Sequence, residues 1–341
     1  MSGTVLVARL DSDGDVLLSG PAIRAVAAGA DRVVVLAGPR GAAAARLLPG
    51  VDEVLVWHCP WIDAEPRPVD PDDVAELVAR LRAQRVDRAL VLSSFHQSPL
   101  PTALVLRLAG VPWIGAVSED YPGSLLDLRH RLPEEGLHEV ERMLSLARAA
   151  GCALPDGDPG GLAVSRPLPD VAALAGDGPY VVVHPGASVP ARSPSPQWSA
   201  RLVAALATAG HRVLVTGGPG ERALTAQVAA AGGTDLGGAT DLAGLAALLD
   251  GASVVVVGNT GPAHLAAAVG TPVVSLFAPV VPAQRWQPYG VATVLLGDQE
   301  ATCRLTRAKD CPVAGHPCLD GIAVADVVTA VDVLCSQEVY A

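Results

Sequence analysis

The chain has 341 residues, half of them apolar and only 3% aromatic, and its formal net charge is −11. At roughly 100–200 residues per domain, this length suggests two domains whose cores are filled mainly by Ala, Val and Leu. The acidic balance excludes proteins that hold nucleic acid or anionic lipid through bulk charge. Lys309 is the only lysine, so an anionic ligand has to be held mostly by arginine or by backbone amides.

In the first half of the chain, short β-branched runs alternate with Ala/Leu-rich amphipathic segments, a pattern typical of a parallel sheet with helices on both faces. The predicted strands are residues 4–10, 32–36, 53–57, 88–92 and 113–117. The predicted helices are residues 15–28, 72–84, 101–108 and 134–150, the second of them opened by Asp70 and Pro71.

Residues 151–178 are dense in Pro, Gly and Asp and are the best linker candidate. The alternation then restarts, with predicted strands at 180–183, 212–215, 253–257, 273–277 and 293–296 and predicted helices at 196–209, 221–231, 241–249, 262–269 and 322–334. The predicted fold class is α/β, with two Rossmann-like, doubly wound parallel-sheet domains at 1–160 and 175–341. The C-terminal helix is a candidate to pack back on the first domain. The carboxyl ends of the two sheets are expected to face a cleft, where such sheets bind ligands.

Residues 251–284 contain no Asp, Glu, Lys or Arg, which raises the question of a membrane span. Repeated prolines and glycines interrupt this stretch, so we interpret it as a buried strand, helix and strand. The N-terminus has no signal-peptide pattern, and six cysteines in so long a chain do not make a disulfide framework, so a reducing cytoplasmic location is expected. The dinucleotide and P-loop glycine motifs are missing, which disfavours nicotinamide dehydrogenases and P-loop enzymes.

Three aspartates, Asp11, Asp13 and Asp15, follow the first predicted strand at the start of the next helix. One interpretation of Asp15 is stabilisation of the helix dipole. The other is a general base, because repulsion between neighbouring carboxylates raises the pKa of one of them. A calcium loop is disfavoured, because the later glycine and the terminal glutamate of such loops are missing.

Two segments of the second half place polar residues just after predicted strands. The first, HPGAS, contains Ser188 and is followed by Arg192, which either binds a phosphate or is a solvated loop cation. In the second, TGGPGE, Thr216 and Gly217 close a strand. Glu221 of that segment either caps the following helix or accepts hydrogen bonds from ribose hydroxyls.

The most informative segment is NTGPAH, which directly follows a fully apolar predicted strand. Pro262 starts an Ala-rich helix, and the amides of Thr260, Gly261 and Ala263 are expected to point at a bound ligand. Helix N-termini bind phosphate without a metal, and glycine permits its close approach. His264 lies in the first helical turn, where a lone histidine is more often structural than catalytic.

Together, GDV near the N-terminus, HPGAS, TGGPGE, NTGPAHLAAAVGTPVVSLFAP, WQPYG and CPVAGHPCLDGI resemble glycosyltransferase family 9, the lipopolysaccharide heptosyltransferase-like family. The motifs occur in the family's order over nearly the whole chain. The resemblance implies a GT-B fold, with the acceptor bound by the first domain and the nucleotide-sugar by the second. It also implies an inverting, metal-independent transfer from an ADP-heptose-type donor, which is a substrate, so that no cofactor is required.

Carried over residue by residue, the resemblance implies that Asp15 is the base that deprotonates the acceptor hydroxyl. Arg192 corresponds to a phosphate-binding Lys or Arg, although the tryptophan that commonly follows is absent, and Glu221 corresponds to the acid that holds the ribose. The diphosphate-binding turn corresponds to Thr260, Gly261 and Pro262, with His264 beside it. The other donor-site candidates are Ser188, Thr216, Gly217 and Asn259, the last of which replaces the family's usual Asp in D-T-G-P.

The acceptor is the least determined part of the prediction. Asp13 and Arg9 are the candidate acceptor contacts, and His96, Arg129 and Arg131 are further guesses. The preference for Arg over Lys and the abundance of Ala, Gly, Val and Pro suggest a GC-rich source. One candidate acceptor is an inner-core lipid, which would bring the chain to a membrane surface. Because an organism of this kind need not make lipopolysaccharide, the alternative is a secondary-metabolite aglycone, aminoglycoside or nucleoside. Nucleic acid is not expected as a partner, and the oligomeric state is left open.

Two other functions stay open, a nucleotide-sugar epimerase or hydrolase of GT-B fold and a non-catalytic nucleotide-sugar binding protein, which Asn259 encourages. Cys303, Cys311 and Cys318 with His316 are a weak zinc candidate. Their spacing of seven and then six residues is not that of a C-x₂-C pair. We therefore predict no metal site, and packed or free thiols at these positions.

Overall fold

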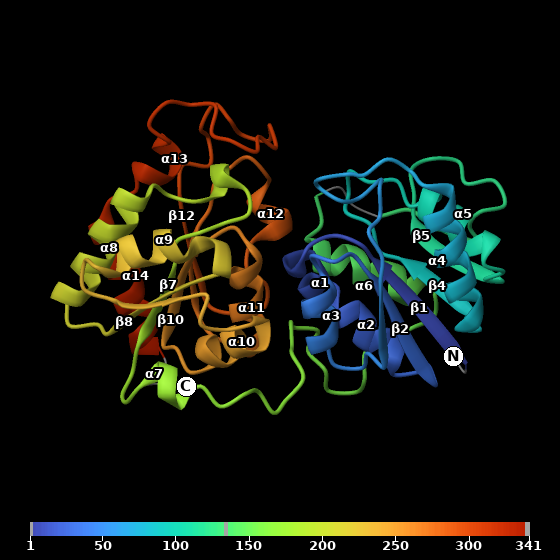
Figure 1. Cartoon of the computed structure of the whole chain (residues 1–341), viewed down its shortest axis with the longest axis horizontal. Helices are drawn as coiled ribbons and strands as arrows, with labels where there is room; N and C mark the ends of the chain where they lie inside the picture. The colour runs from blue at the N-terminus through green and yellow to red at the C-terminus, as the bar shows by residue number, and fades with distance from the viewer. Residues whose placement is uncertain (1–2, 133–135, 338–341) are drawn as a thin grey trace. The chain divides into compact units, whose positions relative to one another are not determined.

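The computed structural model describes residues 3–132 and 136–337. It divides into two compact units, Met1–Ser165 and Arg166–Ala341, each with its own six-stranded sheet (Figure 1). Every paired strand in both sheets runs parallel to its neighbour. The predicted α/β class with two doubly wound parallel sheets is confirmed.

The first unit has the strand order β3-β2-β1-β4-β5-β6. Its strands are β1 (Thr4–Arg9), β2 (Arg32–Ala37), β3 (Glu53–Val56), β4 (Arg88–Val91), β5 (Trp113–Val117) and β6 (Leu128–His130). β1 is central because its Val- and Leu-rich sequence is buried on both faces. The strand order reverses beside β1, and sheets of this class bind ligands at the carboxyl end of such a strand.

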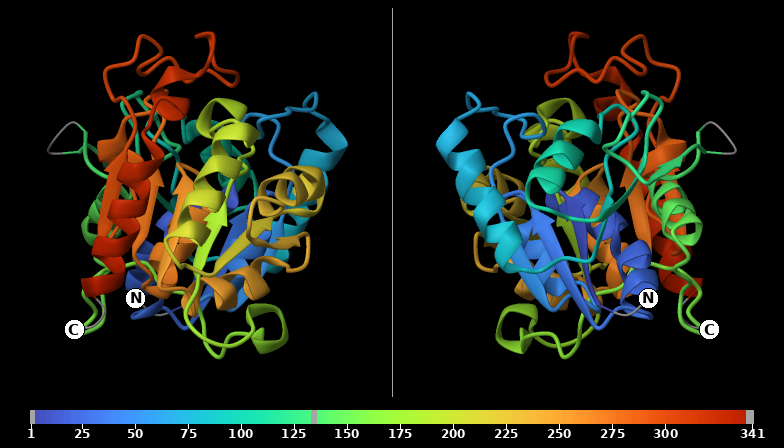
Figure 2. Two further views of the ribbon diagram at one scale, coloured as in Figure 1. Left: turned by 90° about the vertical axis from the view of Figure 1, so that its left-hand side faces the viewer. Right: turned by 90° about the vertical axis from the view of Figure 1, so that its right-hand side faces the viewer.

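Among the described residues of the first unit, six helices cover the sheet, on both of its faces (Figure 2). They are α1 (Asp13–Leu18), α2 (Gly20–Ala27), α3 (Ala42–Leu47), α4 (Pro71–Ala83), α5 (Leu100–Leu108) and α6 (Glu139–Ala149). α2 packs against α6, and α4 packs against α5. The arrangement leaves the strand ends accessible to the loops that carry polar residues.

The predicted helix over 15–28 is wrong in one respect, because the structure divides it into α1 and α2 at Ser19. Pro21 accounts for the break, since proline has no N–H for the carbonyl four residues earlier and its ring crowds that carbonyl. The helix also begins earlier than predicted, with Ser12 in the N-cap position. Asp15 is therefore in the first turn of α1 and not at its first residue.

The predicted helix over 134–150 begins only at Glu139. Its residues 134 and 135 lie outside the described part of the chain. Gly136 has a φ of +81°, which is incompatible with a right-handed helix. His138 then caps α6, with its Nδ1 accepting a hydrogen bond from the amide of Val140 at 3.2 Å.

The residues predicted as a linker divide between the two units. Asp158 accepts two hydrogen bonds from Arg24 of α2, at 2.7 and 2.9 Å, and the amide of Ser165 bonds to the Leu47 carbonyl at 2.7 Å. On the other side of the division, Arg166 makes a two-pronged ion pair with Asp250. Both halves of this Pro- and Gly-rich segment are therefore held by ion pairs within their own units.

The Arg24–Asp158 pair gives a pH-dependent contribution to stability. The hydrogen bonds from Arg24 lower the pKa of Asp158, so the pair stabilises the folded unit above the unfolded pKa of about 4, and this contribution is lost as the pH falls through the lower folded pKa. We expect Asp158→Asn to lower the free energy of unfolding by about 1.5–3 kcal/mol at pH 7, and by progressively less below pH 4. Denaturant titrations at pH 7 and at pH 3 measure this difference.

The control for this prediction is Glu141→Gln. Glu141 pairs with Arg148 at 3.8 Å on the surface of α6, where ion pairs contribute about 0–1 kcal/mol. Equal effects of the two variants at pH 7 would show that the partly buried Arg24–Asp158 pair stabilises the fold no more than a surface pair.

The second unit has the strand order β12-β11-β10-β7-β8-β9. Its strands are β7 (Val181–His184), β8 (Val213–Gly217), β9 (Thr234–Gly237), β10 (Val254–Gly258), β11 (Val273–Leu276) and β12 (Thr293–Leu296). The order reverses between β7 and β10, whose carboxyl ends carry the motifs that begin with His184 and Asn259. This again places the polar motifs at the switch point of a sheet.

The helices of the second unit are α7 (Ala172–Ala175), α8 (Pro196–Thr208), α9 (Arg222–Ala229), α10 (Leu242–Asp250), α11 (Gly261–Val269), α12 (Ala283–Trp286), α13 (Pro317–Asp320) and α14 (Val324–Gln337). Two 3₁₀ turns, Pro190–Arg192 and Pro219–Glu221, precede α8 and α9. The C-terminal helix α14 packs against α8 and β10 of its own unit (Figure 2). Within the described residues, no helix has the length and hydropathy that a membrane span requires.

Candidate active site

In the first unit, a short turn joins the end of β1 to α1. The turn is shaped by close packing against the loop after β2, since a Cβ on Gly38 would lie 2.4 Å from the carbonyl oxygen of Leu10. A Cβ on Gly41 would likewise lie 2.7 Å from the carbonyl oxygen of Asp11. Both distances are far below van der Waals contact, so glycine is required where the two loops meet.

Asp15 projects from α1 and both of its carboxylate oxygens accept hydrogen bonds. Arg9 donates to Oδ1 at 3.1 Å, and the hydroxyl of Ser12 donates to Oδ2 at 2.9 Å. The Asp15 side chain is 24% exposed. A carboxylate that is oriented by its neighbours and still reached by solvent is suited to accept a proton from a bound hydroxyl.

Asp13, a candidate acceptor contact, is directed to the protein backbone. Its Oδ1 accepts a hydrogen bond from the Ala44 amide in the first turn of α3, at 3.1 Å. The pKa of Asp13 is raised by burial, an effect that the Ala44 bond and the charge of Arg40 oppose. The sequence argument expected a raised pKa from repulsion between carboxylates, and at Asp13 the cause is desolvation instead.

The other acceptor candidates occupy different environments. Arg9 is fully buried, so its side chain is placed to hold Asp15 and is withdrawn from solvent. Arg129 donates hydrogen bonds to the carbonyls of Ser118 and Glu119, which follow β5. His96 and Arg131 are exposed. His96, on the loop after β4, lies at the same edge of the sheet as Asp15.

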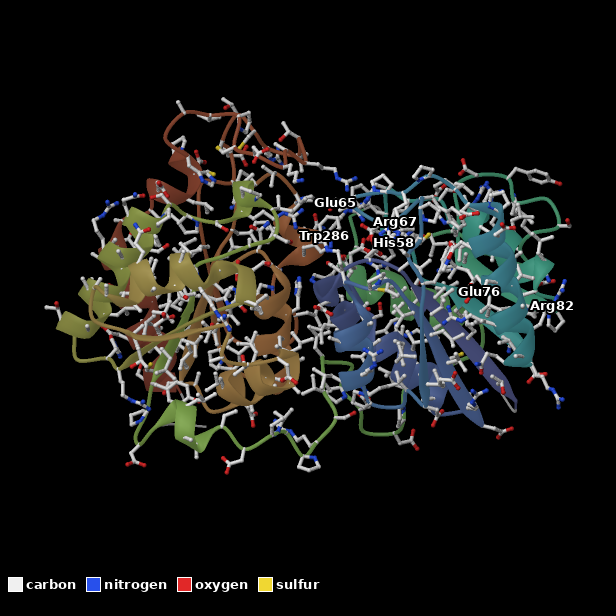
Figure 3. The ribbon with its side chains drawn as sticks, in the orientation of Figure 1. His58, Glu65, Arg67, Glu76, Arg82 and Trp286 are labelled. Carbon is white, nitrogen blue, oxygen red and sulfur yellow. The ribbon has the colours of Figure 1, made fainter. Side chains whose placement is uncertain are left out.

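A further group of polar side chains at this edge comes from the segment between β3 and α4. Figure 3 shows His58, Glu65 and Arg67 on this segment, whereas Glu76 and Arg82 lie further along α4, away from these three residues. His58 is held by Asp63, with Nε2 at 3.2 Å from Oδ2. The sequence argument did not select this segment, because its residues form no recognisable motif.

In the second unit, the loops after β7 and β10 approach each other very closely. A Cβ on Gly258, the last residue of β10, would lie 2.3 Å from the carbonyl oxygen of Arg192. Arg192 is therefore placed next to Asn259 and Thr260. The structure thus brings together two of the candidate donor-site motifs, which are far apart in the sequence.

The loop after β8 joins this group through Glu221. Its carboxylate lies against Gly186 of HPGAS, where a Cβ would come within 1.9 Å of Oε1, and its Oε2 accepts a hydrogen bond from the Gly218 amide at 2.7 Å. Capping of the following helical turn is thus one role of Glu221. The side chain is nevertheless 28% exposed. Ser188, two residues beyond Gly186, is exposed.

His184 and Thr216 form a buried connection under Glu221. His184 Nδ1 lies 3.1 Å from the Thr216 hydroxyl, and its Nε2 lies 3.8 Å from the carboxylate of Glu221. Burial lowers the pKa of His184 more than the charge of Glu221 raises it, which favours the neutral imidazole. Thr216 is buried and bonded to His184, so it supports the site from beneath. Gly217 packs so closely against Thr225 and Glu221 that only glycine fits at this position.

The side chain of Asn259 is occupied by the protein backbone. Its Oδ1 accepts a hydrogen bond from the amide of Ala278 at 3.1 Å, and its Nδ2 donates to the carbonyl of the same residue at 3.4 Å. Only an amide makes both bonds, because a carboxylate has no N–H to donate. Asn259 is buried and braces the loop after β11 against the end of β10.

The amides at the start of α11 are less available than the sequence suggested. The Thr260 amide bonds to the Gly258 carbonyl at 2.8 Å, and the Ala263 amide bonds to the Thr260 carbonyl at 3.0 Å. The expectation that both point at a ligand is therefore wrong, because tight turns satisfy them internally. Gly261 and Pro262 are partly exposed at the helix start, and His264 is buried within its first turn.

The cysteine-bearing segment after β12 packs against the loops of the donor-site candidates. The amide of Leu305 bonds to the Pro279 carbonyl at 2.8 Å, and the amide of Ala191 bonds to the Lys309 carbonyl at 3.0 Å. Cys303, Cys311 and Cys318 line one cavity of about 280 Å³, and burial raises the pKa of Cys318 to about 12. Across the described residues, no group of three or more His, Cys, Asp or Glu side chains is arranged to hold a metal ion.

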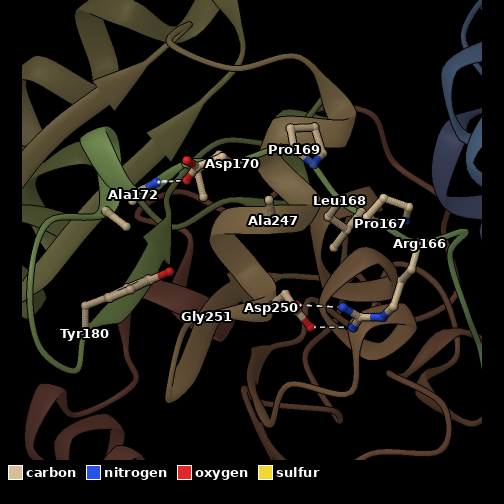
Figure 4. A pocket seen from close by; sticks show the side chains of 12 residues that line it. Arg166, Pro167, Leu168, Pro169, Asp170, Ala172, Tyr180, Ala247, Asp250 and Gly251 are labelled. Atoms are coloured by element: carbon tan, nitrogen blue, oxygen red, sulfur yellow. Dashed lines mark hydrogen bonds and ion pairs between the residues drawn. The ribbon is translucent and has the colours of Figure 1, made fainter.

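A cavity of about 750 Å³ in the second unit lies elsewhere (Figure 4). It is lined by Arg166–Ala172 and by Tyr180, Ala247 and Asp250, at the amino end of the sheet. The Arg166–Asp250 ion pair closes one wall (Figure 4). None of the candidate donor-site residues lines it, so it is separate from the site at the carboxyl end.

The model of glycosyltransferase family 9 (heptosyltransferase) matches residues 74–315. The chain belongs to glycosyltransferase family 9. This establishes a glycosyltransferase of the heptosyltransferase type, as the sequence motifs predicted. A search of curated proteins found no match.

Solved structures share the fold of this family 9 chain. A family 9 glycosyl transferase from Veillonella parvula is 17% identical, with a TM-score of 0.80 over 98% of this chain and 97% of that one. The E. coli ADP-heptose LPS heptosyltransferase II is 21% identical, with a TM-score of 0.74 over 98% and 99%. E. coli heptosyltransferase WaaC with ADP-2-deoxy-2-fluoro heptose is 19% identical, with a TM-score of 0.68 over 96% and 99%. The predicted GT-B fold is confirmed.

Several residues of the site were missed by the sequence argument. Ser12, which bonds to Asp15 and lies among the three aspartates, and His184, which lies beneath Glu221 and opens HPGAS, were not selected. Asp11 was noted as one of three aspartates but given no role, and it pairs with Arg9 at 3.0 Å. A signal was present in each case, namely a polar residue at the carboxyl end of a central strand.

Proposed function

We propose that this family 9 enzyme transfers a heptosyl group from ADP-heptose to an acceptor hydroxyl, with inversion at the anomeric carbon and without a metal ion. The observation that carries the proposal is Asp15, an accessible carboxylate whose two oxygens are held by Arg9 and Ser12 at the switch point of the first sheet. Inversion in a single displacement needs one base for the incoming hydroxyl and stabilisation of the leaving diphosphate.

In this mechanism the acceptor binds to the first unit and Asp15 removes the proton of its hydroxyl. The oxygen then attacks the anomeric carbon as the bond to the diphosphate breaks, and ADP leaves with the bonding electron pair. The acceptor is either an inner-core lipid or a secondary-metabolite aglycone, aminoglycoside or nucleoside. His58, His96 and Arg67 at the same sheet edge are available to contact it.

The donor binds to the second unit, at the three loops that the close glycine contacts bring together. Arg192, the Gly261 amide and the Thr260 side chain bind the diphosphate at the start of α11, next to Pro262, and stabilise the charge that develops on it. Glu221 accepts hydrogen bonds from the ribose hydroxyls, and Ser188 lies nearby. Asn259, Thr216 and His264 are buried and support this site from beneath.

Two structural relatives support ADP-heptose as the donor. One is an ADP-heptose LPS heptosyltransferase, and the other is WaaC with an ADP-linked fluoro-heptose. The scarcity of lysine is compatible with this donor, because arginine and backbone groups can hold a diphosphate.

A thermal-shift comparison of ADP, GDP, UDP and TDP, each alone and as its sugar conjugate, tests the donor. A nucleotide at 100 times its dissociation constant adds about 2.7 kcal/mol to stability, which raises the unfolding temperature by several degrees. We expect ADP and ADP-heptose to give the largest shifts. A larger shift with UDP or TDP would overturn the assignment of the nucleoside.

A further inference from the structure

Arg9, at the end of β1, belongs to a closed ring of polar contacts with Ser94, Gln97 and Asp11. Arg9 donates to the Ser94 hydroxyl at 2.8 Å, and the Ser94 amide donates to the Gln97 side-chain oxygen at 2.9 Å. Gln97 donates to Oδ1 of Asp11 at 2.5 Å, and Oδ2 of Asp11 returns to Nε of Arg9 at 3.0 Å. The ring joins β1, the turn after it and the loop after β4.

Asp15 lies outside this ring, but its carboxylate also contacts the guanidinium of Arg9. The guanidinium of Arg9 donates a hydrogen bond from NH2 to Asp15 at 3.1 Å, and its Nε lies 3.0 Å from Oδ2 of Asp11 in an ion pair without hydrogen-bond geometry. Arg9 also donates to the carbonyl of Leu92 at 3.2 Å and has no exposed surface. Its position is therefore fixed by several partners, and its buried positive charge is shared by the carboxylates of Asp11 and Asp15, with Glu139 of α6 also acting on it.

This division of charge affects how strongly Asp15 holds a proton. An unshared arginine at hydrogen-bond distance would stabilise the Asp15 carboxylate and make it a weak base. Asp11 opposes that effect in two ways, because it neutralises part of the charge of Arg9 and because it is itself a nearby negative charge. A general base is most effective when its proton affinity is close to that required at the working pH.

We propose that Arg9 and Asp11 are positioning residues for Asp15: Arg9 orients its carboxylate, and Asp11 limits the stabilisation by Arg9 so that Asp15 remains basic enough to accept the acceptor proton. The inference about catalysis rests on the proposed function of Asp15 as the base. The inference about charge sharing rests on the contacts alone.

Other charged groups also lie near Arg9 and Asp15. Glu139 of α6 acts on Arg9 and raises its pKa together with Asp11 and Asp15, against the lowering effect of burial, so the guanidinium stays charged. Arg142 of α6 donates to the carbonyl of Ser93. Asp13 and Arg40 interact with each other beside α1 and α3. None of these groups is altered in the variants below, so their effect on the titration midpoint of Asp15 is the same in every variant.

The test is an NMR titration of ¹³C-labelled aspartate carboxyl groups in the full chain, with the Asp15 signal assigned by its loss in Asp15→Asn. We expect Asp11→Asn to lower the titration midpoint of Asp15 by about one pH unit, because Asp11 then no longer competes for the charge of Arg9 and its own negative charge is removed. Arg9→Lys should leave the midpoint close to that of the unmodified chain, since the charge is kept. Arg9→Met should raise it.

Turnover of ADP-heptose supplies the second readout. We expect Asp11→Asn to lower kcat about tenfold with little change in KM for the donor, and the acid limb of its pH profile to move down with the Asp15 midpoint. The control is Asp127→Asn, which removes a carboxylate from the Arg107 ion pair elsewhere in the unit. It should change neither the Asp15 midpoint nor the pH profile. If Arg9→Met does not fold, Asp11→Asn carries the test by itself.

The outcomes separate the two proposals. An unchanged Asp15 midpoint in Asp11→Asn would overturn the charge sharing, whatever the activity. A shifted midpoint with unchanged kcat would overturn its role in catalysis. An active Asp15→Asn enzyme would instead overturn the proposed base, while leaving the titration result intact.

Discussion

Asp15→Asn is expected to lower turnover by about 10²–10⁴, the range that a positioned general base contributes, while the affinity for ADP changes little. The amide cannot take up the hydroxyl proton at the pH of the reaction. It keeps the size of the side chain, its carbonyl oxygen can still accept the hydrogen bond from Arg9, and its N–H can donate to the Ser12 hydroxyl, so the fold is retained. Turnover with ADP-heptose and calorimetric titration with ADP measure the two parts of this prediction.

Glu76→Gln is the matched control for Asp15→Asn. Glu76 is an exposed carboxylate on α4 of the same unit, so the change of charge is identical (Figure 3). Its activity should equal that of the unmodified chain. If Asp15→Asn keeps more than about a tenth of the activity, Asp15 is not the base, because the loss is then below that range.

Gly258→Ala is expected to weaken ADP binding about tenfold or more and to lower turnover about 10²-fold, the effect of a displacement of about 1 Å in a site. The new methyl group would lie 2.3 Å from the carbonyl oxygen of Arg192, a backbone atom that cannot rotate away. The loops after β7 and β10 must therefore separate. Calorimetric titration with ADP, together with the melting temperature of the variant, measures the effect.

Gly161→Ala is the control, because a Cβ at Gly161 meets no atom within 4 Å and its backbone conformation suits alanine. It should bind ADP normally. If Gly258→Ala also binds ADP normally while its melting temperature falls, the contact between the two loops matters for stability and does not shape a donor site.

The central elements of both sheets could be predicted from the sequence because their strands are almost entirely apolar. β10 reads VVVVG and is buried throughout, and this short apolar run before Asn259 was predicted as a buried strand. The edge strands β6 and β9 were missed. β9 reads TDLG and is half exposed, and at an edge the hydrophobic pattern that identifies a strand is no longer required.

The candidate site was predicted where a motif carries the chemistry and missed where contacts between distant segments carry it. Asp15 and Glu221 follow from their motifs. The pairing of Arg9 with Ser94 depends on β1 lying beside β4, and that of His184 with Thr216 on the register of β7 and β8. The internal bond of the Thr260 amide depends on a local turn whose geometry the residue types do not specify.

The proposed reaction is tested most directly by its products. The chain is incubated with ADP-heptose and a panel of acceptors that includes an inner-core lipid, aminoglycosides and nucleosides, and the mixtures are analysed by mass spectrometry. We predict that one class of acceptor gains a single heptosyl residue, with an equal amount of ADP released and no reaction in Asp15→Asn. Release of ADP and free heptose without any glycosylated acceptor, or binding of ADP-heptose without turnover, would contradict the assignment of this chain as a transferase that uses this donor.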